Sequence, residues 1–184
     1  MVLTLMIITA IAGFALGGVY NLTKEPIRLA KKAKAEAAIK EVLPEFDSLR
    51  AFKILPKGAT DSITVNEAFN NNGEMVGRAI SSYSNKGYDP TQIRIMVGIL
   101  PGGIINNTSV IQHKETPGLG TKMEEPDFKG QFEGVNPQDF ALKVKKEGGD
   151  VDAITAATIS SEAFCDAVRR AYDAYKNIEG GNEQ

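Results

Sequence analysis

Hydroxyl side chains gather in residues 152–161, Asp-Ala-Ile-Thr-Ala-Ala-Thr-Ile-Ser-Ser, just before an apolar pattern of helical spacing. Three of them are Thr155, Thr158 and Ser160. The simplest role is a helix cap, in which Thr158 or Ser160 accepts a hydrogen bond from an unpaired N–H group. A cap needs only one hydroxyl, however, and the small Ala156 and Ala157 leave Thr158 open to a bulky partner. Because a helix N-terminus carries about half a positive charge, a phosphate ester on Thr158 would keep its anionic oxygens in a favourable field.

A second polar stretch, His-Lys-Glu-Thr-Pro-Gly-Leu-Gly-Thr-Lys-Met at residues 113–123, combines charged side chains with a tight turn. Pro117 restricts one backbone dihedral, and Gly118 and Gly120 permit turns closed to other residues. Neither glycine has a side chain that would obstruct a planar ring. The polar residues around this turn are His113, Glu115, Thr116 and Lys122. A plain loop between a strand and a short helix is the alternative interpretation.

The composition excludes several kinds of chemistry. The chain has 184 residues, one Cys, one His and no Trp, so an intrachain disulfide and a zinc site of Cys and His alone are excluded. A single imidazole also makes a catalytic triad a weak interpretation, and we expect His113 to be structural and Cys165 to be a small buried thiol. The formal net charge of −2 gives no global field for nucleic acid. These limits indicate that any chemistry belongs to a bound group.

The N-terminal residues 2–22 contain no charged side chain. A helix of this length spans about 30 Å, the thickness of a bilayer's hydrocarbon core, and we expect a retained transmembrane helix. A cleaved signal peptide is the alternative, but the basic start is missing. Gly13 and Gly17 allow another helix to approach closely, or are ordinary glycine content. The basic residues that follow favour a cytoplasmic position for that side by charge alone.

The elements that must position the two polar stretches are short. Pro26 suits the first position of a polar helix that ends before Pro44. Strands are predicted at 62–69, 75–83, 93–100, 109–113 and 140–144, and a helix at 160–175. We therefore expect an α+β domain of short antiparallel strands and helices. The predicted boundaries are a transmembrane helix at 1–23, a connecting helix at 24–44 and the domain at 45–184.

The two polar stretches carry a family resemblance. Residues 152–158 fit the flavinylation pattern Asp-x-x-Ser/Thr-Gly/Ala-Ala-Thr, and residues 115–120 are similar to a Glu-Thr-Pro-Gly-Leu-Gly loop. With an N-terminal helix running into residues 20–26, the chain resembles the family of Rnf-complex G subunits over essentially its whole length. The C subunit of the sodium-translocating NADH:quinone reductase is a close relative of that family. Two departures are Ala156, where Gly is more usual, and residues 89–91, which replace a Gly-Pro step.

The resemblance implies an FMN-binding domain in which a flavin transferase links FMN through its phosphate to Thr158. The residues that the transferase would read are Asp152, Thr155, Ala157 and Thr158. The phosphate would be held near the N–H groups of Ile159, Ser160 and Ser161. The residues that would border the ring are Glu115, Thr116, Gly118, Leu119 and Gly120. Lys122 would favour the reduced, anionic flavin through its charge, or is simply a solvated lysine.

The function implied by the resemblance is that of an electron-carrier subunit. Such a complex moves electrons between ferredoxin and NAD, coupled to Na⁺ or H⁺ transport, and this subunit would not itself bind either substrate. The partners implied are other subunits of the complex and, during maturation, the flavin transferase. The flavin domain would lie on the outer face of the cytoplasmic membrane. The alternatives are the C subunit of the quinone reductase, a free-standing membrane-anchored flavoprotein, and a non-redox binding module.

Overall fold

The computed structural model describes residues 1–56 and 61–181. The helices are α1 (Val2–Val42), α2 (Pro126–Lys129) and α3 (Thr158–Glu179). The strands are β1 (Ser48–Ile54), β2 (Ile63–Phe69), β3 (Met75–Ser84), β4 (Ile93–Ile99) and β5 (Ile105–Gln112). Three short 3₁₀ helices are η1 (Gly120–Glu124), η2 (Gly130–Phe132) and η3 (Lys145–Glu147). Residues 1–36 form one compact unit and the residues from Ala37 onward form a second.

Within the described ranges, the strands of the second unit form one antiparallel sheet in the order β1-β2-β3-β4-β5. Each strand therefore pairs with its neighbour in the chain, an arrangement that antiparallel strands allow. The turn at residues 70–73 ends in Gly73, which has a positive φ of 78°. This sheet confirms the predicted α+β class and the strands expected at 62–69, 75–83 and 93–100.

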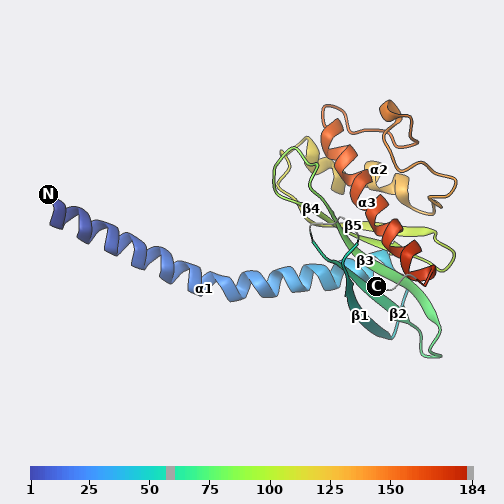
Figure 1. The fold of residues 1–184 in the computed structure, drawn as a ribbon, viewed down its shortest axis with the longest axis horizontal. Helices are drawn as coiled ribbons and strands as arrows, with labels where there is room; N and C mark the ends of the chain where they lie inside the picture. The colour runs from blue at the N-terminus through green and yellow to red at the C-terminus, as the bar shows by residue number, and fades with distance from the viewer. Residues whose placement is uncertain (57–60, 182–184) are drawn as a thin grey trace. The chain divides into compact units, whose positions relative to one another are not determined.

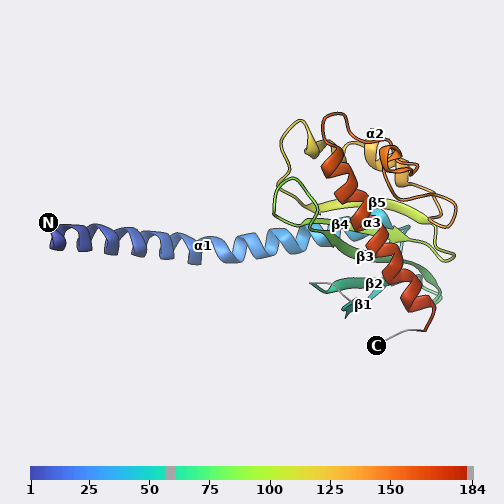
Figure 2. The same ribbon diagram turned by 45° about the horizontal axis from the view of Figure 1, so that its top comes forward.

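One face of the sheet is covered by α3, which lies across it in Figures 1 and 2. Residues of α3 recur at helical spacing in the core, where Phe164 packs against Phe128 and Phe132 with ring centroids 5.2 and 4.9 Å away. Ile80 and Val97 meet them from β3 and β4. Each such buried side chain stabilises the fold by about 1.5–3 kcal/mol. This packing fixes where the N-terminus of α3 lies.

The other face of the sheet is covered by the last turns of α1, which belong to the second unit. Ile39, Val42 and Leu43 are buried against Ala79 and Met96. Alternate residues along a strand face opposite sides, so Ala79 and Met96 point away from the α3 core. At Gly98, an added Cβ would lie 1.9 Å from the Val42 carbonyl oxygen. Only glycine therefore lets the end of α1 approach β4 this closely.

The first unit is the exposed, apolar part of α1. Within the described ranges, α1 is the one helix long and apolar enough to cross a membrane, with a mean hydropathy of 2.3 over 18 residues. That window is fully exposed, as expected of a surface that faces lipid. The helix fits single-pass anchoring in a membrane.

Several predicted boundaries are wrong. Pro26 does not begin a new helix but lies inside α1. Residues 140–144 form no strand, because the segment folds back on itself and makes only a single bridge, between Val144 and Val151. The last strand begins at Ile105 rather than at residue 109, and the edge strand β1 is not predicted at all. Helix α3 is longer than predicted at both ends.

Candidate functional site

The turn before α3 presents Thr158 as the first residue of the helix. Ala157 occupies the N-cap position, with φ −137° and ψ 43°, and has no side-chain oxygen with which to cap. The interpretation of Thr158 or Ser160 as the cap is therefore wrong. The chain reaches this position through a turn in which the Ala157 N–H donates to the Ile154 carbonyl oxygen at 3.0 Å. The first N–H groups of α3 are left without a side-chain cap.

Ala156 gives this turn its unusual geometry. Its φ is 61°, in the left-handed region, and it is the one non-glycine residue in the described ranges with a positive φ. That conformation costs an L-residue about 1–2 kcal/mol because Cβ crowds the following carbonyl oxygen. Ala156 is the position where the family pattern more usually has Gly, so the departure seen in the sequence introduces strain two residues before Thr158.

The hydroxyls of this stretch divide into two kinds. Ser161 Oγ accepts a hydrogen bond from the Ile154 N–H at 2.9 Å and donates to the Ala157 carbonyl oxygen at 3.0 Å. Ser160 Oγ donates to a carboxylate oxygen of Glu115 at 2.5 Å. The hydroxyls of Thr155 and Thr158 make no hydrogen bond with any residue that the structure describes. Thr158 is half-buried, and it is the residue of this stretch that stands first in the helix while its hydroxyl makes no hydrogen bond with a described residue.

The Glu-Thr-Pro-Gly-Leu-Gly loop is held at its base and within its turn. The Nδ1 atom of His113 accepts the Glu115 N–H at 3.1 Å, and Nε2 lies 3.3 Å from a carboxylate oxygen of Glu124. His113 follows the end of β5, and these two contacts fit the structural role expected for it. Inside the loop, the Gly118 N–H donates to Thr121 Oγ1 at 2.9 Å. Gly118 has a positive φ of 75° and open space where a side chain would be.

A buried carboxylate brings three segments together. Glu115 is 4% exposed. One of its oxygens accepts the Ser160 hydroxyl, and the other accepts the Asp89 N–H at 3.2 Å. An added Cβ would lie 2.6 Å from this carboxylate at Gly87, and 2.6 Å from Ser160 Oγ at Gly120. These five residues, Gly87, Asp89, Glu115, Gly120 and Ser160, are called the Glu115 junction below.

Three exposed apolar side chains flank this junction in the sequence. Tyr88 is 73% exposed, Leu119 is 40% exposed and Ile159 is 49% exposed. The loop that contains Tyr88 and the loop after β5 run side by side near the start of α3 in Figures 1 and 2. Exposed apolar side chains around a hydroxyl group are suited to a planar aromatic ring. The predicted site thus has a hydroxyl, an uncapped helix N-terminus and an apolar border.

Sequence reasoning overlooked part of this border. Gly87, Tyr88 and Asp89 were not among the predicted site residues, although they begin the stretch that resembles the family's Gly-Tyr-x-Gly-Pro-Ile segment. The close approach of Gly87 to Glu115 arises from the return of β4 beside β3, which local sequence does not reveal. Lys122, which was among the predicted site residues, has an exposed side chain that makes no ion pair or hydrogen bond with a described residue.

The backbone before the turn at residues 154–157 is held by hydrogen bonds to the side chain of Gln131. Its Oε1 accepts the Asp152 N–H at 2.7 Å, and its Nε2 donates to the Asp152 carbonyl oxygen at 3.1 Å. The Asp152 carboxylate is exposed and pairs with Lys145 at 2.8 Å. Asp152 and Thr155 are accessible on the surface, whereas Ala157 is 7% exposed and belongs to the core.

Cys165 is a buried free thiol on α3. Burial raises the pKa of the Cys165 thiol to about 12, so it stays protonated at neutral pH. Among the described residues, no group of three or more His, Cys, Asp and Glu side chains could hold a metal ion.

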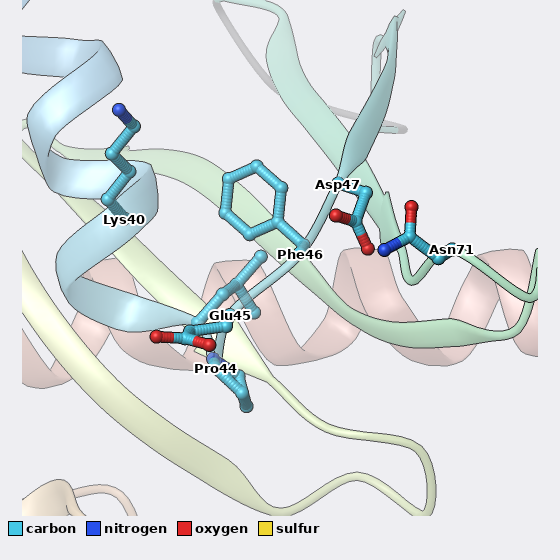
Figure 3. Close-up of a pocket in the computed structure, with 7 residues that line it drawn as sticks. Lys40, Pro44, Glu45, Phe46, Asp47 and Asn71 are labelled. Atoms are coloured by element: carbon cyan, nitrogen blue, oxygen red, sulfur yellow. The ribbon is translucent and has the colours of Figure 1, made fainter.

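An open hollow of about 550 Å³ lies at the end of α1 and the start of β1 (Figure 3). It is lined by Lys40, Leu43, Pro44, Glu45, Phe46, Asp47 and Asn71, and no predicted flavin-site residue is among them.

Comparison with known proteins gives the class of this domain. Residues 87–173 match the family model described as an FMN-binding domain. The matched range begins at Gly87 and ends within α3, so it contains the whole Glu115 junction and Thr158. The fold and site therefore define an FMN-binding domain, and the free hydroxyl, uncapped helix start and apolar border fit that cofactor.

The relatives are more specific. The G subunit of the ion-translocating oxidoreductase complex of Methanosarcina acetivorans is 31% identical over 97% of this chain and 95% of that protein. The G subunit of the Na(+)-translocating ferredoxin:NAD(+) oxidoreductase complex of Acetobacterium woodii is 29% identical over 96% of this chain and 90% of that protein. The crystal structure of Shewanella oneidensis NqrC matches 72% of this chain and 65% of that chain at 19% identity, with a TM-score of 0.42 too low to carry weight. The chain belongs to the family of G subunits of ion-translocating oxidoreductase complexes.

Proposed function

We propose that this chain is the electron-carrier subunit of a membrane-bound, Rnf-type complex that couples ferredoxin:NAD oxidoreduction to Na⁺ or H⁺ transport. Family membership supports this role, because the relatives are named as subunits of such complexes. The chain acts as a redox subunit of the complex and does not itself bind ferredoxin or NAD. Its partners are the other subunits, which bring further redox groups close to its flavin.

FMN is attached covalently through its phosphate to Thr158. The single observation that carries this proposal is the position of Thr158: it is the first residue of α3, and its hydroxyl makes no hydrogen bond with any described residue. The nearby Ser160 and Ser161 hydroxyls are both engaged by protein groups, so neither is a comparable acceptor. When bound, FMN supplies reversible electron transfer, and the protein supplies orientation and electrostatics.

The first turn of α3 holds the phosphate. The N–H groups of Ile159 and Ser160 have no acceptor inside the helix, because the first N–H groups of any helix lack one. The Ser161 N–H is different, since it donates to the Ala157 carbonyl oxygen at 3.1 Å. We therefore assign the phosphate to Ile159 and Ser160, where the partial positive charge of the helix start favours an anion.

The ring packs against the loops that border the acceptor. Leu119, Ile159 and Tyr88 provide exposed apolar surface, and Gly118 provides space. Thr116 and Gly120 lie in the same loop. Lys122, which is exposed, would favour the reduced, anionic flavin through its charge. Glu115 differs from its neighbours because both of its carboxylate oxygens are engaged by protein donors.

A flavin transferase matures the chain by reading the acceptor turn. Asp152 and Thr155 are exposed and accessible to another protein, and Thr158 is the group modified. The buried Ala157 contributes differently, since its small side chain fits the core below the turn. The flavin domain lies on the outer face of the cytoplasmic membrane, anchored by the first part of α1. The family resemblance supports this face, whereas the charges after residue 23 favour the opposite one by the positive-inside tendency.

Replacement of the acceptor hydroxyl tests this proposal. After co-expression with a flavin transferase, wild type and Thr158→Ser are expected to give a band that fluoresces under ultraviolet light on a denaturing gel. Thr158→Ala is expected to give a dark band of equal protein staining, because no hydroxyl remains to be esterified. A Thr158→Ala band as bright as wild type would show that the flavin is attached elsewhere.

A further inference from the structure

Glu115 is a buried carboxylate that no described basic side chain neutralises. It is 4% exposed, and its partners are the Ser160 hydroxyl and the Asp89 N–H. Burying an ionisable group is unfavourable unless its hydrogen bonds compensate. The 2.5 Å separation from Ser160 Oγ is typical of a charge-assisted O–H···O⁻ bond, which is stronger than a neutral one. These two hydrogen bonds therefore favour one orientation of the Glu115 side chain.

Two glycines make this arrangement specific. An added Cβ at Gly120 would lie 2.6 Å from Ser160 Oγ and 2.7 Å from the Glu115 Cβ. At Gly87, it would lie 2.6 Å from the Glu115 carboxylate. Both approaches are closer than real Cβ contacts permit. In both cases the glycine backbone lies against side-chain atoms of Glu115 or Ser160, so the junction depends on these close contacts as well as on hydrogen bonds.

Each residue of the apolar border is adjacent in sequence to a residue of the Glu115 junction. Tyr88 lies between Gly87 and Asp89. Leu119 precedes Gly120, and Ile159 precedes Ser160. A backbone fixed at one residue strongly restricts the direction of the next side chain. The carboxylate of Glu115 thus joins the three segments from which these side chains come.

We propose that Glu115 is a positioning residue that holds Tyr88, Leu119 and Ile159 in the arrangement against which the flavin ring packs. Glu115 acts through Ser160 and Asp89 and does not touch the ring. This role rests on the proposed attachment of FMN to Thr158. It predicts that loss of the junction leaves the flavin attached but less firmly held.

The test compares variants of the full-length chain, co-expressed with a flavin transferase and purified in detergent. Ser160→Ala and Glu115→Ala remove the short hydrogen bond from either side, and Glu115→Gln keeps an oxygen that accepts from Ser160. The matched control is Ser84→Ala, since Ser84 is also fully buried and donates to a carboxylate, that of Asp166, at 2.9 Å. Ser84 lies at the end of β3 and the carboxylate on α3, so the control loses a buried bond between a serine and a carboxylate that also joins α3 to another segment. Ser84 Oγ accepts the Lys86 N–H at 3.2 Å as well.

Three quantities are measured for each variant: covalent FMN per chain by intact mass, the anisotropy of flavin emission, and the quenching of that emission by iodide. Ser160→Ala and Glu115→Ala are expected to keep FMN but to show lower anisotropy and stronger quenching. Glu115→Gln is expected to be intermediate. Ser84→Ala is expected to lower the unfolding temperature while leaving both flavin signals at the wild-type values.

Several results would overturn the role of Glu115. One is wild-type anisotropy and quenching in Ser160→Ala, which stays informative if Glu115→Ala does not fold. A second is an equal change in Ser84→Ala, since general loss of stability would then explain the effect. A third is a folded Ser160→Ala chain without FMN, which would place Ser160 in the attachment chemistry instead. A wild-type chain without covalent FMN would overturn the proposed attachment of FMN as well. The intact mass of the wild-type chain distinguishes that case from failure of the role of Glu115 alone.

Discussion

At the scale of single residues, the turn that leads to Thr158, the proposed acceptor, is strained at Ala156. Ala156 has φ 61°, whereas glycine would adopt this conformation without a Cβ clash. The strain costs about 1–2 kcal/mol, but it is localised at the residue that reverses the chain before α3. An alanine here also has fewer conformations in the unfolded chain than a glycine, which offsets part of the cost.

Replacing Ala156 by glycine is therefore expected to stabilise the chain by about 0.5–1 kcal/mol, the strain relieved less the entropy that glycine adds. The measurement is the free energy of unfolding in urea. Ala153→Gly is the control, because Ala153 is exposed in the same loop and has no positive φ. It is expected to be neutral or slightly destabilising. Equal effects of the two changes would contradict the strain at residue 156.

At the scale of elements, α3 is fixed to the sheet by a buried carboxylate as well as by apolar packing. Burial opposes ionisation of the Asp166 carboxyl, but hydrogen bonds from Lys86, Ser84 and Arg170 outweigh it and hold its pKa below the usual range. Asp166 pairs with Lys86 at 2.9 Å and with Arg169 at 2.7 Å. The ionised form therefore connects the middle of α3 to the end of β3.

Asp166→Asn tests this connection through pH. An aspartate has a pKa of about 3.9 when unfolded, and the folded-state value is lower, so the carboxylate stabilises the fold above about pH 4. We expect the variant to be less stable at pH 7 by about 1–3 kcal/mol, the usual contribution of hydrogen bonds to a charged group. The difference from wild type should shrink as the pH falls through the folded-state pKa. A difference that stayed constant down to pH 3 would contradict this account.

The elements were predictable where the pattern was local and strong. Strands β2, β3 and β4 follow from apolar β-branched runs bounded by turns, and α3 from its apolar stripe. Strand β1 was not predictable from the sequence, because it is an edge strand with mostly exposed side chains and lacks a clear apolar pattern. Residues 140–144 have the composition of a strand, but the Asp150 side chain and backbone close that segment into a loop. In both segments the backbone conformation depends on contacts with residues outside the segment, which the local pattern does not reveal.

The site was predictable only in part for a similar reason. Thr158 and the Glu-Thr-Pro-Gly-Leu-Gly loop stand out as motifs within one stretch of chain. The contact between Glu115 and Ser160 joins residues 45 positions apart. Nothing in either motif says that the Glu115 carboxylate is turned inward rather than toward a ligand. That orientation follows from the packing of α3 on the sheet, which places Ser160 above the loop.

At the scale of the whole molecule, the end of α1 is an integral part of the second unit. Ile39, Val42 and Leu43 cover one face of the sheet, and Glu41 binds Ser109 and Lys129 at 2.6 Å each. Three large buried side chains contribute about 1.5–3 kcal/mol each, a large part of the 5–15 kcal/mol by which a domain is typically stable. The compact unit accordingly begins at Ala37.

Two truncations test this boundary. A chain that begins at Ala37 is expected to fold and to accept FMN. A chain that begins at Glu45 is expected to unfold at a lower temperature or to be insoluble, because Ala68, Ala79 and Met96 lose their cover. Thermal unfolding followed by circular dichroism checks both. Equal unfolding temperatures of the two truncated chains would mean that the end of α1 adds nothing to the stability of the domain.

A membrane anchor and a covalent cofactor together suit a carrier that works inside a fixed complex. The apolar part of α1 fits anchoring of the chain in the membrane, and the proposed phosphodiester would prevent loss of the flavin by dissociation. The overall net charge of −2 is small, so steering by the whole molecule is weak and assembly with partner subunits must bring the redox groups together. The account therefore requires that the flavin be bonded to the chain itself.

The most direct measurement is the intact mass of the chain purified from its native host, followed by peptide mapping of residues 152–161. The account predicts an added mass of one FMN less one water, located on Thr158. An unmodified Thr158 in that material would contradict the central claim.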